Sequence, residues 1–215
     1  MSTSTSGRSK SFGQEGGLTY VDRLGVWLSQ RKALAQVAPW VGKDVGDFGC
    51  GFEAALVRRI LPEVSTATIA DVAIAADLKE HHKVRAIEGT LPEVWSKVDD
   101  ASLDIVLCVA VLEHLWEPEI ALREFHRILK VGGVAFVTVP TWLDKWPLEF
   151  SAFRLGLSPP EEMNDHKRYY SPKDLWPMLV RAGFLPQDIR CRRHKFGLHT
   201  FATCRRREES SFGLR

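Results

Sequence analysis

The sequence lacks any long hydrophobic run. No window in its 215 residues reaches the roughly 18 consecutive apolar residues that a membrane-spanning helix needs. Residues 1–17 also contain no apolar stretch of the kind that a secretion signal carries. They are rich in serine, threonine and glycine, which predicts a disordered tail. We therefore expect a cytoplasmic protein.

The sequence also has few cysteines and a small net charge. The four cysteines are far apart and form no CxxC pair, so we expect free thiols and no metal site. The formal net charge is +2, from 29 basic and 27 acidic residues, which is too small to argue for a nucleic-acid partner. With 45% hydrophobic residues, the chain can bury one sizeable core.

The chain alternates between strand patterns and helix patterns. The predicted strands end at Asp47 or Phe48 and then cover residues 65–70, 84–89, 102–111 and 134–140. Helical patterns cover Leu18–Trp40, residues 54–62, residues 73–82 and the segment that opens at Glu117-Pro118-Glu119. Ser171 opens a last helix as a capping box, which Pro177 should kink or shorten. Two strands without a helix between them, around 188–192 and 198–204, close the chain.

This order predicts an α/β protein, a Rossmann-like three-layer sandwich whose mostly parallel sheet ends in an antiparallel C-terminal edge hairpin. We expect one domain over residues 18–207 and a flexible tail over 208–215. Residues 141–170 form an insertion that is rich in aromatic side chains. Long links of this kind in compact domains are often lids over a site, and packing on the sheet or a homodimer contact is an equal alternative.

A glycine turn follows the first strand. Gly49, Gly51 and Ala54 fit the spacing of the dinucleotide fingerprint, which on its own does not distinguish NAD from another nucleoside cofactor. Asp47 does discriminate, because a carboxylate beside this turn would repel a pyrophosphate but attract a sulfonium or an ammonium. Asp71, 20 residues beyond Gly51, can accept the ribose hydroxyls of either cofactor. The simpler alternatives are that Asp47 braces the turn and that Asp71 caps a helix.

The downstream motifs resolve this choice through a resemblance. Residues 103–140 include Leu112-Glu113-His114-Leu115 and the turn that ends in Lys130-Val131-Gly132-Gly133. Together with residues 47–51 and 166–172, they resemble the class I S-adenosylmethionine-dependent methyltransferases that act on small molecules. The resemblance covers roughly residues 31 to 204, and the ordered set of motifs is specific where no single one is.

The resemblance implies a cofactor site for S-adenosyl-L-methionine at the ends of the first, second and fourth strands. Two positions depart from the family pattern: Glu53 stands where a third glycine is usual, and Glu88-Gly89-Thr90-Leu91 replaces a Gly-Asp pair that meets the adenine. The cofactor-binding residues that we expect are Asp47, Phe48, Gly49, Cys50, Gly51, Asp71, Val72, Thr90, Leu91, Cys108, Val109 and Ala110.

A hydroxyl acceptor needs a general base near its proton. His114 and His166 are the candidate catalytic residues, with a structural or solvent-exposed role as the alternative for each. Trp142, Tyr169 and Tyr170 are the candidate substrate-binding residues. We therefore predict methyl transfer to a small-molecule acceptor, with oxygen favoured. An NAD-dependent oxidoreductase and a non-catalytic methyltransferase-like domain that binds a partner remain as alternatives.

Overall fold

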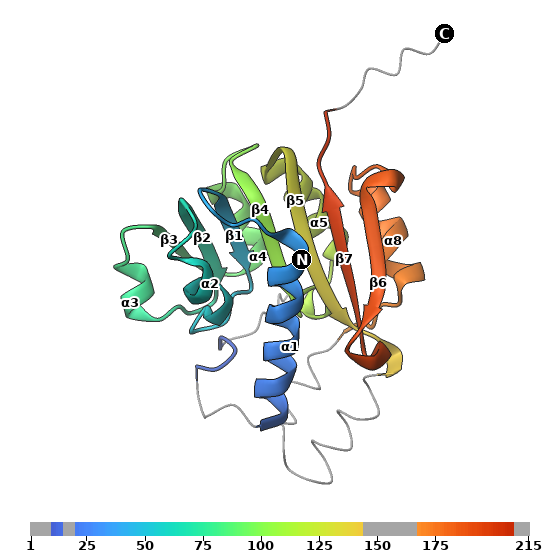
Figure 1. Cartoon of the computed structure of the whole chain (residues 1–215), viewed down its shortest axis with the longest axis horizontal. Helices are drawn as coiled ribbons and strands as arrows, with labels where there is room; N and C mark the ends of the chain where they lie inside the picture. Colours follow the sequence, from blue (N-terminus) through green and yellow to red (C-terminus); the bar gives the residue numbers. More distant parts are fainter. Residues whose placement is uncertain (1–9, 15–19, 144–166, 209–215) are drawn as a thin grey trace, which may run out of the picture.

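The structure is a computed structural model that describes residues 10–14, 20–143 and 167–208. Within these ranges seven strands form one sheet (Figure 1). Their order across it is β3 (Val84–Glu88), β2 (Thr66–Asp71), β1 (Asp44–Phe48), β4 (Leu103–Val109), β5 (Leu129–Pro140), β7 (His199–Arg205) and β6 (Ile189–His194).

The first five strands are parallel to one another, whereas β7 runs antiparallel to both β5 and β6. Parallel strands place their carboxyl ends at one edge of the sheet. The predicted Rossmann-like sandwich with an antiparallel edge hairpin is therefore confirmed.

Helices cover both faces of the sheet and complete the three layers (Figure 1). One core cluster joins the sheet to α1 (Tyr20–Val37), α2 (Ala55–Ile60) and α3 (Ala76–Lys79). The other joins it to α4 (Leu91–Val94), α5 (Pro118–Ile128) and α8 (Pro172–Arg181). Short 3-10 turns, among them η2 (Leu112–His114) and η4 (Lys195–Gly197), lie in the connections.

Three elements differ in length from what the sequence pattern predicts. After Asp71 the chain forms only the short α3, because two amides before it bond elsewhere: Ile74 donates to Glu88 Oε1 and Ala75 donates to Phe52 O. Strand β5 begins already at Leu129, because the Gly132 amide donates to Arg206 O at 2.7 Å. Helix α8 continues past Pro177 to Arg181, four residues beyond the proline that was expected to kink or shorten it.

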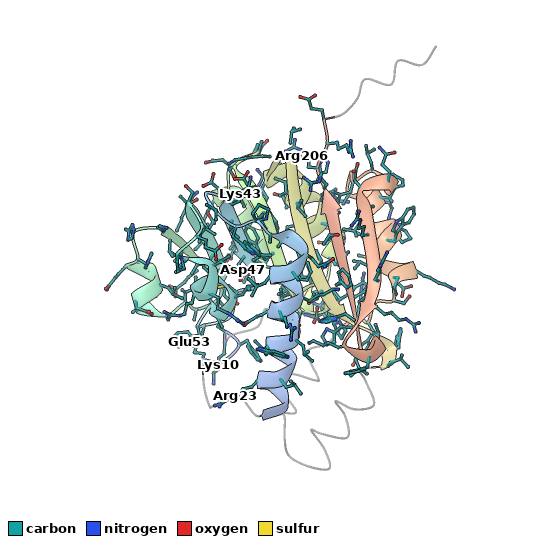
Figure 2. All side chains as sticks on the ribbon, viewed as in Figure 1. Lys10, Arg23, Lys43, Asp47, Glu53 and Arg206 are labelled. Carbon is teal, nitrogen blue, oxygen red and sulfur yellow. The ribbon has the colours of Figure 1, made fainter. Side chains whose placement is uncertain are left out.

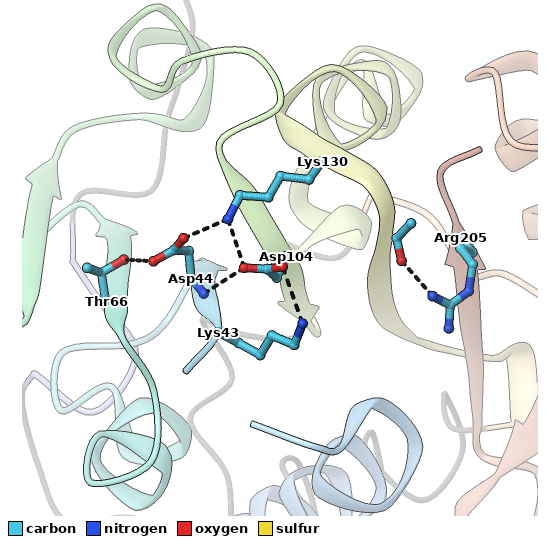
Figure 3. A network of polar contacts seen from close by, with 7 residues as sticks. Lys43, Asp44, Thr66, Asp104, Lys130 and Arg205 are labelled. Carbon is cyan, nitrogen blue, oxygen red and sulfur yellow. Dashed lines mark hydrogen bonds and ion pairs between the residues drawn. The ribbon is translucent and has the colours of Figure 1, made fainter. Parts of the chain in front are cut away.

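An ionic network ties together the amino ends of the strands (Figure 3). Lys130 Nζ lies 2.7 Å from Asp44 Oδ2 and 2.9 Å from Asp104 Oδ2, and Thr66 Oγ1 donates to Asp44 Oδ1. The hydrogen bond from Lys130 is the largest cause that lowers the pKa of Asp44. The network therefore joins β1, β2, β4 and β5 at the edge opposite the glycine turn, where it supports the fold.

Candidate cofactor site

The glycine turn lies where β1 ends between β2 and β4. Gly49 has φ +81° and donates its amide to Ala70 O at 2.8 Å, which closes the turn on the end of β2. A Cβ at Gly49 would overlap the side chain of Val111. Gly51 also has a left-handed φ, of +75°. Both positions thus need glycine, and the turn lies at the carboxyl edge, where ligands of open α/β sheets bind.

Asp71 ends β2 and braces this turn. Its Oδ2 accepts the amide of Gly51 at 2.8 Å, and its Oδ1 accepts the amide of Val72 at 2.8 Å. The hydroxyl of Ser11 donates to the same Oδ1 at 2.6 Å. Asp71 is only partly buried, so its carboxylate stands at the surface of the candidate site.

Asp47 is the buried acid of the site, with 3% of its surface exposed (Figure 2). Burial raises the pKa of its carboxyl to about 7, and the charge of Asp71 adds to this effect. Two acids beside one turn disfavour a pyrophosphate. A cation at this position would instead stabilise the ionised form of Asp47. Asp47 and Asp71 together therefore fit the positively charged methionine end of S-adenosylmethionine better than they fit a dinucleotide.

Two expected cofactor residues direct their side chains away from this acid. The Phe48 ring packs 5.0 Å from the Trp95 ring and 6.0 Å from the Phe125 ring, in the core beneath α4 and α5. Cys108 is fully buried in the same core. Only the backbone of these two residues can face a ligand. Cys50, in the turn itself, is half-buried, and burial raises the pKa of its thiol.

The other expected contacts lie at neighbouring strand ends. Thr90 is the N-cap of α4 in a capping box with Glu93, and Leu91 is buried in the α4 core. Val109 is half-buried at the end of β4. Ala110 follows it with φ 56° and donates its amide to Thr138 O at 3.0 Å. Contact of these residues with a cofactor stays a prediction.

Glu53, the departure from the family pattern, has an exposed side chain that pairs with Arg58. Its side chain is 60% exposed, and its Oε2 lies 3.2 Å from Arg58 NH2. Figure 2 shows Glu53 on the side of the molecule opposite Lys43 and Arg206. Glu53 thus lies at the carboxyl edge with its carboxylate paired with Arg58 in solvent. Glu88, the second departure, accepts the Ile74 amide and pairs with Lys79 at 2.9 Å.

The acceptor side is built from η2 and the segment 167–170. The Lys167 amide donates to Glu113 O at 2.9 Å, and Lys167 Nζ donates to His114 O at 2.6 Å. These bonds place the chain that leads into α8 directly on η2, so His114 lies at the carboxyl edge. His166 lies outside the described residues.

The candidate substrate-binding aromatics divide into two kinds. The Trp142 ring lies 4.9 Å from the Tyr169 ring, and Trp142 is 60% exposed. Tyr170 is instead 3% exposed and belongs to the core, where burial is the main cause that raises its pKa to about 12. Their contact with a substrate stays a prediction, and for Tyr170 only a small part of the surface is available for it.

The sequence gives no signal for one residue near the site and only a weak signal for the burial of another. Ser11 belongs to the stretch whose composition predicts a tail, and no local pattern signals its bond to Asp71. Glu113 is 1% exposed beside the acceptor side, and its charge contributes to the raised pKa of both Cys108 and Tyr170. Its place in an apolar Leu-Glu-His-Leu segment was the one available signal that this acid is buried.

A separate surface hollow offers no competing site. Its cations already have partners: Arg58 donates to Asp77 at 2.6 Å, and Lys83 Nζ donates to Leu61 O and Val64 O. The hollow lies at the C-terminal end of α2, away from the glycine turn, and its lining residues are Arg58, Leu61, Pro62, His81, His82 and Lys83.

Two kinds of feature are absent from the described part of the chain. No helix there is both long and apolar enough to cross a membrane. No three or more His, Cys, Asp or Glu side chains there are grouped so that they could hold a metal ion.

Comparisons with known proteins agree with this geometry. Residues 46–137 match the family described as "Methyltransferase domain". A probable S-adenosylmethionine-dependent methyltransferase of Mycobacterium tuberculosis is 27% identical over 166 residues, which cover 74% of this chain and 56% of that protein. A ubiquinone biosynthesis O-methyltransferase of Pseudomonas syringae pv. tomato is 26% identical over 175 residues, covering 76% of this chain and 71% of that protein.

A solved structure shows the same fold. The SAM-dependent methyltransferase of Archaeoglobus fulgidus superposes with a TM-score of 0.60 at 15% identity, over 86% of this chain and 94% of that one. The chain thus spans only about half the length of the mycobacterial relative but nearly all of this structural neighbour. Fold, glycine turn and sequence likeness agree: residues 46–137 match a methyltransferase domain, and about three quarters of the chain is similar to S-adenosylmethionine-dependent methyltransferases.

Proposed function

We propose that this protein transfers a methyl group from S-adenosylmethionine to a hydroxyl oxygen of a small, apolar, ring-shaped acceptor. The observation that carries the proposal is the pair of acids beside the glycine turn, Asp47 buried and Asp71 at the surface. Because a fold hosts many activities, this site is a better guide to the function than the sheet is.

The residues of the turn have separate tasks in this function. The cofactor, when bound, supplies a methyl group on a positively charged sulfur. Asp71 accepts hydrogen bonds from the ribose, and Asp47 in its ionised form stabilises the cationic end. Gly49 and Gly51 allow the backbone to lie close to the ligand. Alignment of the two reactants is the main contribution of the protein to such a displacement.

The exposed aromatic pair supports an apolar acceptor. Trp142 lies two residues beyond the carboxyl end of β5, and its ring lies 4.9 Å from that of Tyr169. A flat apolar surface beside the strand ends favours a ring that can stack on it. The Pseudomonas relative is an O-methyltransferase, which supports oxygen as the methylated atom.

The general base is one of two histidines in this proposal. His114 lies in η2, where its carbonyl is held by Lys167 Nζ. His166 precedes Lys167, whose amide is bonded to Glu113 O. Both remain candidates, and a pH profile of each alanine variant would distinguish them. Loss of the acidic limb of the rate profile in one variant alone would identify the base.

The test measures S-adenosylhomocysteine formed from S-adenosylmethionine in the presence of catechol, a ring hydroxyl, or benzylamine, a ring amine. We expect product with catechol, little with benzylamine, and loss of turnover in Trp142→Ala without loss of cofactor binding. Trp176→Ala, on the exposed face of α8, is the matched control. Turnover with benzylamine alone would contradict oxygen as the acceptor atom. Binding of NAD without binding of S-adenosylhomocysteine would contradict the proposed function as a whole.

A further inference from the structure

The segment of residues 10–14 lies on the glycine turn. Ser11 is 5% exposed, and its hydroxyl donates to Asp71 Oδ1 at 2.6 Å. Phe12 O accepts the Phe52 amide at 2.9 Å and would lie 3.3 Å from a Cβ at Gly51. The segment thus contacts both the acid and the backbone of the candidate cofactor site.

The segment also has an ordered local conformation. The Ser11 amide donates to Gln14 Oε1 at 3.0 Å, and the Gln14 amide donates back to Ser11 O at 3.1 Å. These two bonds close a turn that fixes the Ser11 hydroxyl against Asp71. The contact is therefore held from both sides, by this turn and by the Phe12–Phe52 backbone bond.

The number of hydrogen-bond acceptor positions on Asp71 decides whether Ser11 and a ribose can bind this carboxylate together. An ionised carboxylate accepts about four hydrogen bonds, two on each oxygen. On Oδ1 both positions are taken, by the Val72 amide and by the Ser11 hydroxyl. On Oδ2 one is taken, by the Gly51 amide. Among the described residues, one acceptor position of Asp71 therefore stays open, whereas a ribose that engages Asp71 with both hydroxyls needs two.

Of the three donors, only Ser11 can leave without opening the turn. The amides of Gly51 and Val72 belong to the backbone next to Asp71 itself, so they stay as long as the turn exists. Ser11 is 60 residues away in sequence and reaches Asp71 through a side chain. A second ribose hydroxyl therefore takes its place on Oδ1.

We propose that residues 10–14 are part of the cofactor site and that the Ser11 hydroxyl occupies the place of a ribose hydroxyl until the cofactor displaces it. This inference rests on the proposed function, because it takes Asp71 as the ribose acceptor. The apparent affinity for the cofactor is then the intrinsic affinity multiplied by the fraction of molecules whose Ser11 is released. Ser11 sets that fraction.

The test is a calorimetric titration of the full chain with S-adenosylhomocysteine. In Ser11→Ala the competing hydroxyl is gone, so we expect binding about tenfold tighter than in the wild type, the size of one hydrogen bond to a charged group. Ser11→Thr keeps a hydroxyl and should bind like the wild type. Ser96→Ala, which loses a serine hydrogen bond to Glu93 O on the surface, is the matched control.

Hydrogen exchange of the same proteins gives a second readout. In the wild type, added S-adenosylhomocysteine should speed exchange in residues 10–14, because the segment loses its anchor on Asp71. Unchanged affinity in Ser11→Ala would overturn the inference, and so would weaker binding, which would mean that Ser11 helps to hold the ligand. If neither the wild type nor any variant binds S-adenosylhomocysteine, the proposed function itself fails, which is a different result from equal binding.

Discussion

Asp71 ends the strand beside the one that carries Asp47, and its charge adds to the effect of burial in raising the pKa of Asp47. The two carboxyls therefore cannot ionise independently. At a pKa of about 7, Asp47 is half-protonated at neutral pH in the structure described above. A ligand that brings a cation to Asp47 must shift this equilibrium towards the carboxylate.

Cofactor binding should therefore depend on pH. Only about one tenth of Asp47 is ionised one unit below its pKa, so S-adenosylhomocysteine should bind about tenfold more weakly at pH 6 than at pH 8. Binding near pH 6 should also release close to one proton. Calorimetry in two buffers with different ionisation enthalpies measures both effects. The same affinity at both pH values, with no proton release, would show that Asp47 does not contact the cationic end.

Replacing Asp47 with Asn should stabilise the protein at alkaline pH. Its folded pKa of about 7 lies above the ordinary value of 3.8. The stability that the protonated carboxyl contributes is thus fully present below about pH 4 and is lost as pH rises through about 7. Asn keeps the neutral state, so Asp47→Asn should gain about 2–4 kcal/mol at pH 8 and nothing near pH 4.

Urea denaturation at the two pH values measures this difference. Asp99→Asn is the control, because Asp99 is exposed. The Ser102 hydroxyl donates to the backbone carbonyl of Asp99, so the substitution keeps this bond. The stabilised Asp47→Asn variant should bind S-adenosylhomocysteine more weakly than the wild type. A variant less stable than the wild type at pH 8 would contradict the buried, raised-pKa state of Asp47.

The glycine turn can be tested with two glycines of similar backbone conformation. Gly49 has φ +81° and Gly42 has φ +69°, but a Cβ at Gly49 would overlap Val111, whereas one at Gly42 meets nothing within 4 Å. We expect Gly42→Ala to cost about 1 kcal/mol from backbone strain alone. Gly49→Ala should cost about 2–4 kcal/mol, because overpacking adds to strain, and should abolish binding of S-adenosylhomocysteine. Thermal unfolding and calorimetry measure the two effects, and equal losses in both variants would refute the close approach of Val111.

The network at the amino ends of the strands should affect stability without affecting the site. Lys130→Met removes the partner of Asp44 and Asp104, and because these groups are partly exposed the loss should be only about 1 kcal/mol. Asp44 has a lowered pKa, so this contribution is present above its ordinary pKa and disappears as pH falls through the folded value. Urea denaturation at pH 7 and pH 3 measures the change. Weaker cofactor binding in Lys130→Met would show that the two edges are coupled.

Much of the fold follows from local patterns. The alternation of apolar strands with helices, the capping box at Ser171 and the glycine turn are all set by residues close in sequence, and the structure confirms each of them. Because parallel strands place their ends at one edge, the order of strands also places Asp47 near Asp71. The resemblance to methyltransferases could be recognised from the sequence for the same reason, since its motifs are short and ordered.

The direction of several side chains could not be predicted in this way. Phe48 and Asp47 are neighbours in sequence, yet a strand sends one into the α4 and α5 core and leaves the other beside the site. Glu53 occupies a position where glycine was expected, and only the position of Arg58 shows that it points to solvent. The direction of such a side chain depends on which elements pack against each face of the sheet.

The sequence by itself determined the class of fold, the glycine turn of the candidate cofactor site and the acids that flank it, because these are properties of local spacing and periodicity. Only the tertiary structure decided that Asp71 shares its oxygens with Ser11, and that segment 167–170 lies on η2. Both contacts join residues more than fifty positions apart. A contact of that kind depends on how the whole chain packs, and neither end of it carries a local signal.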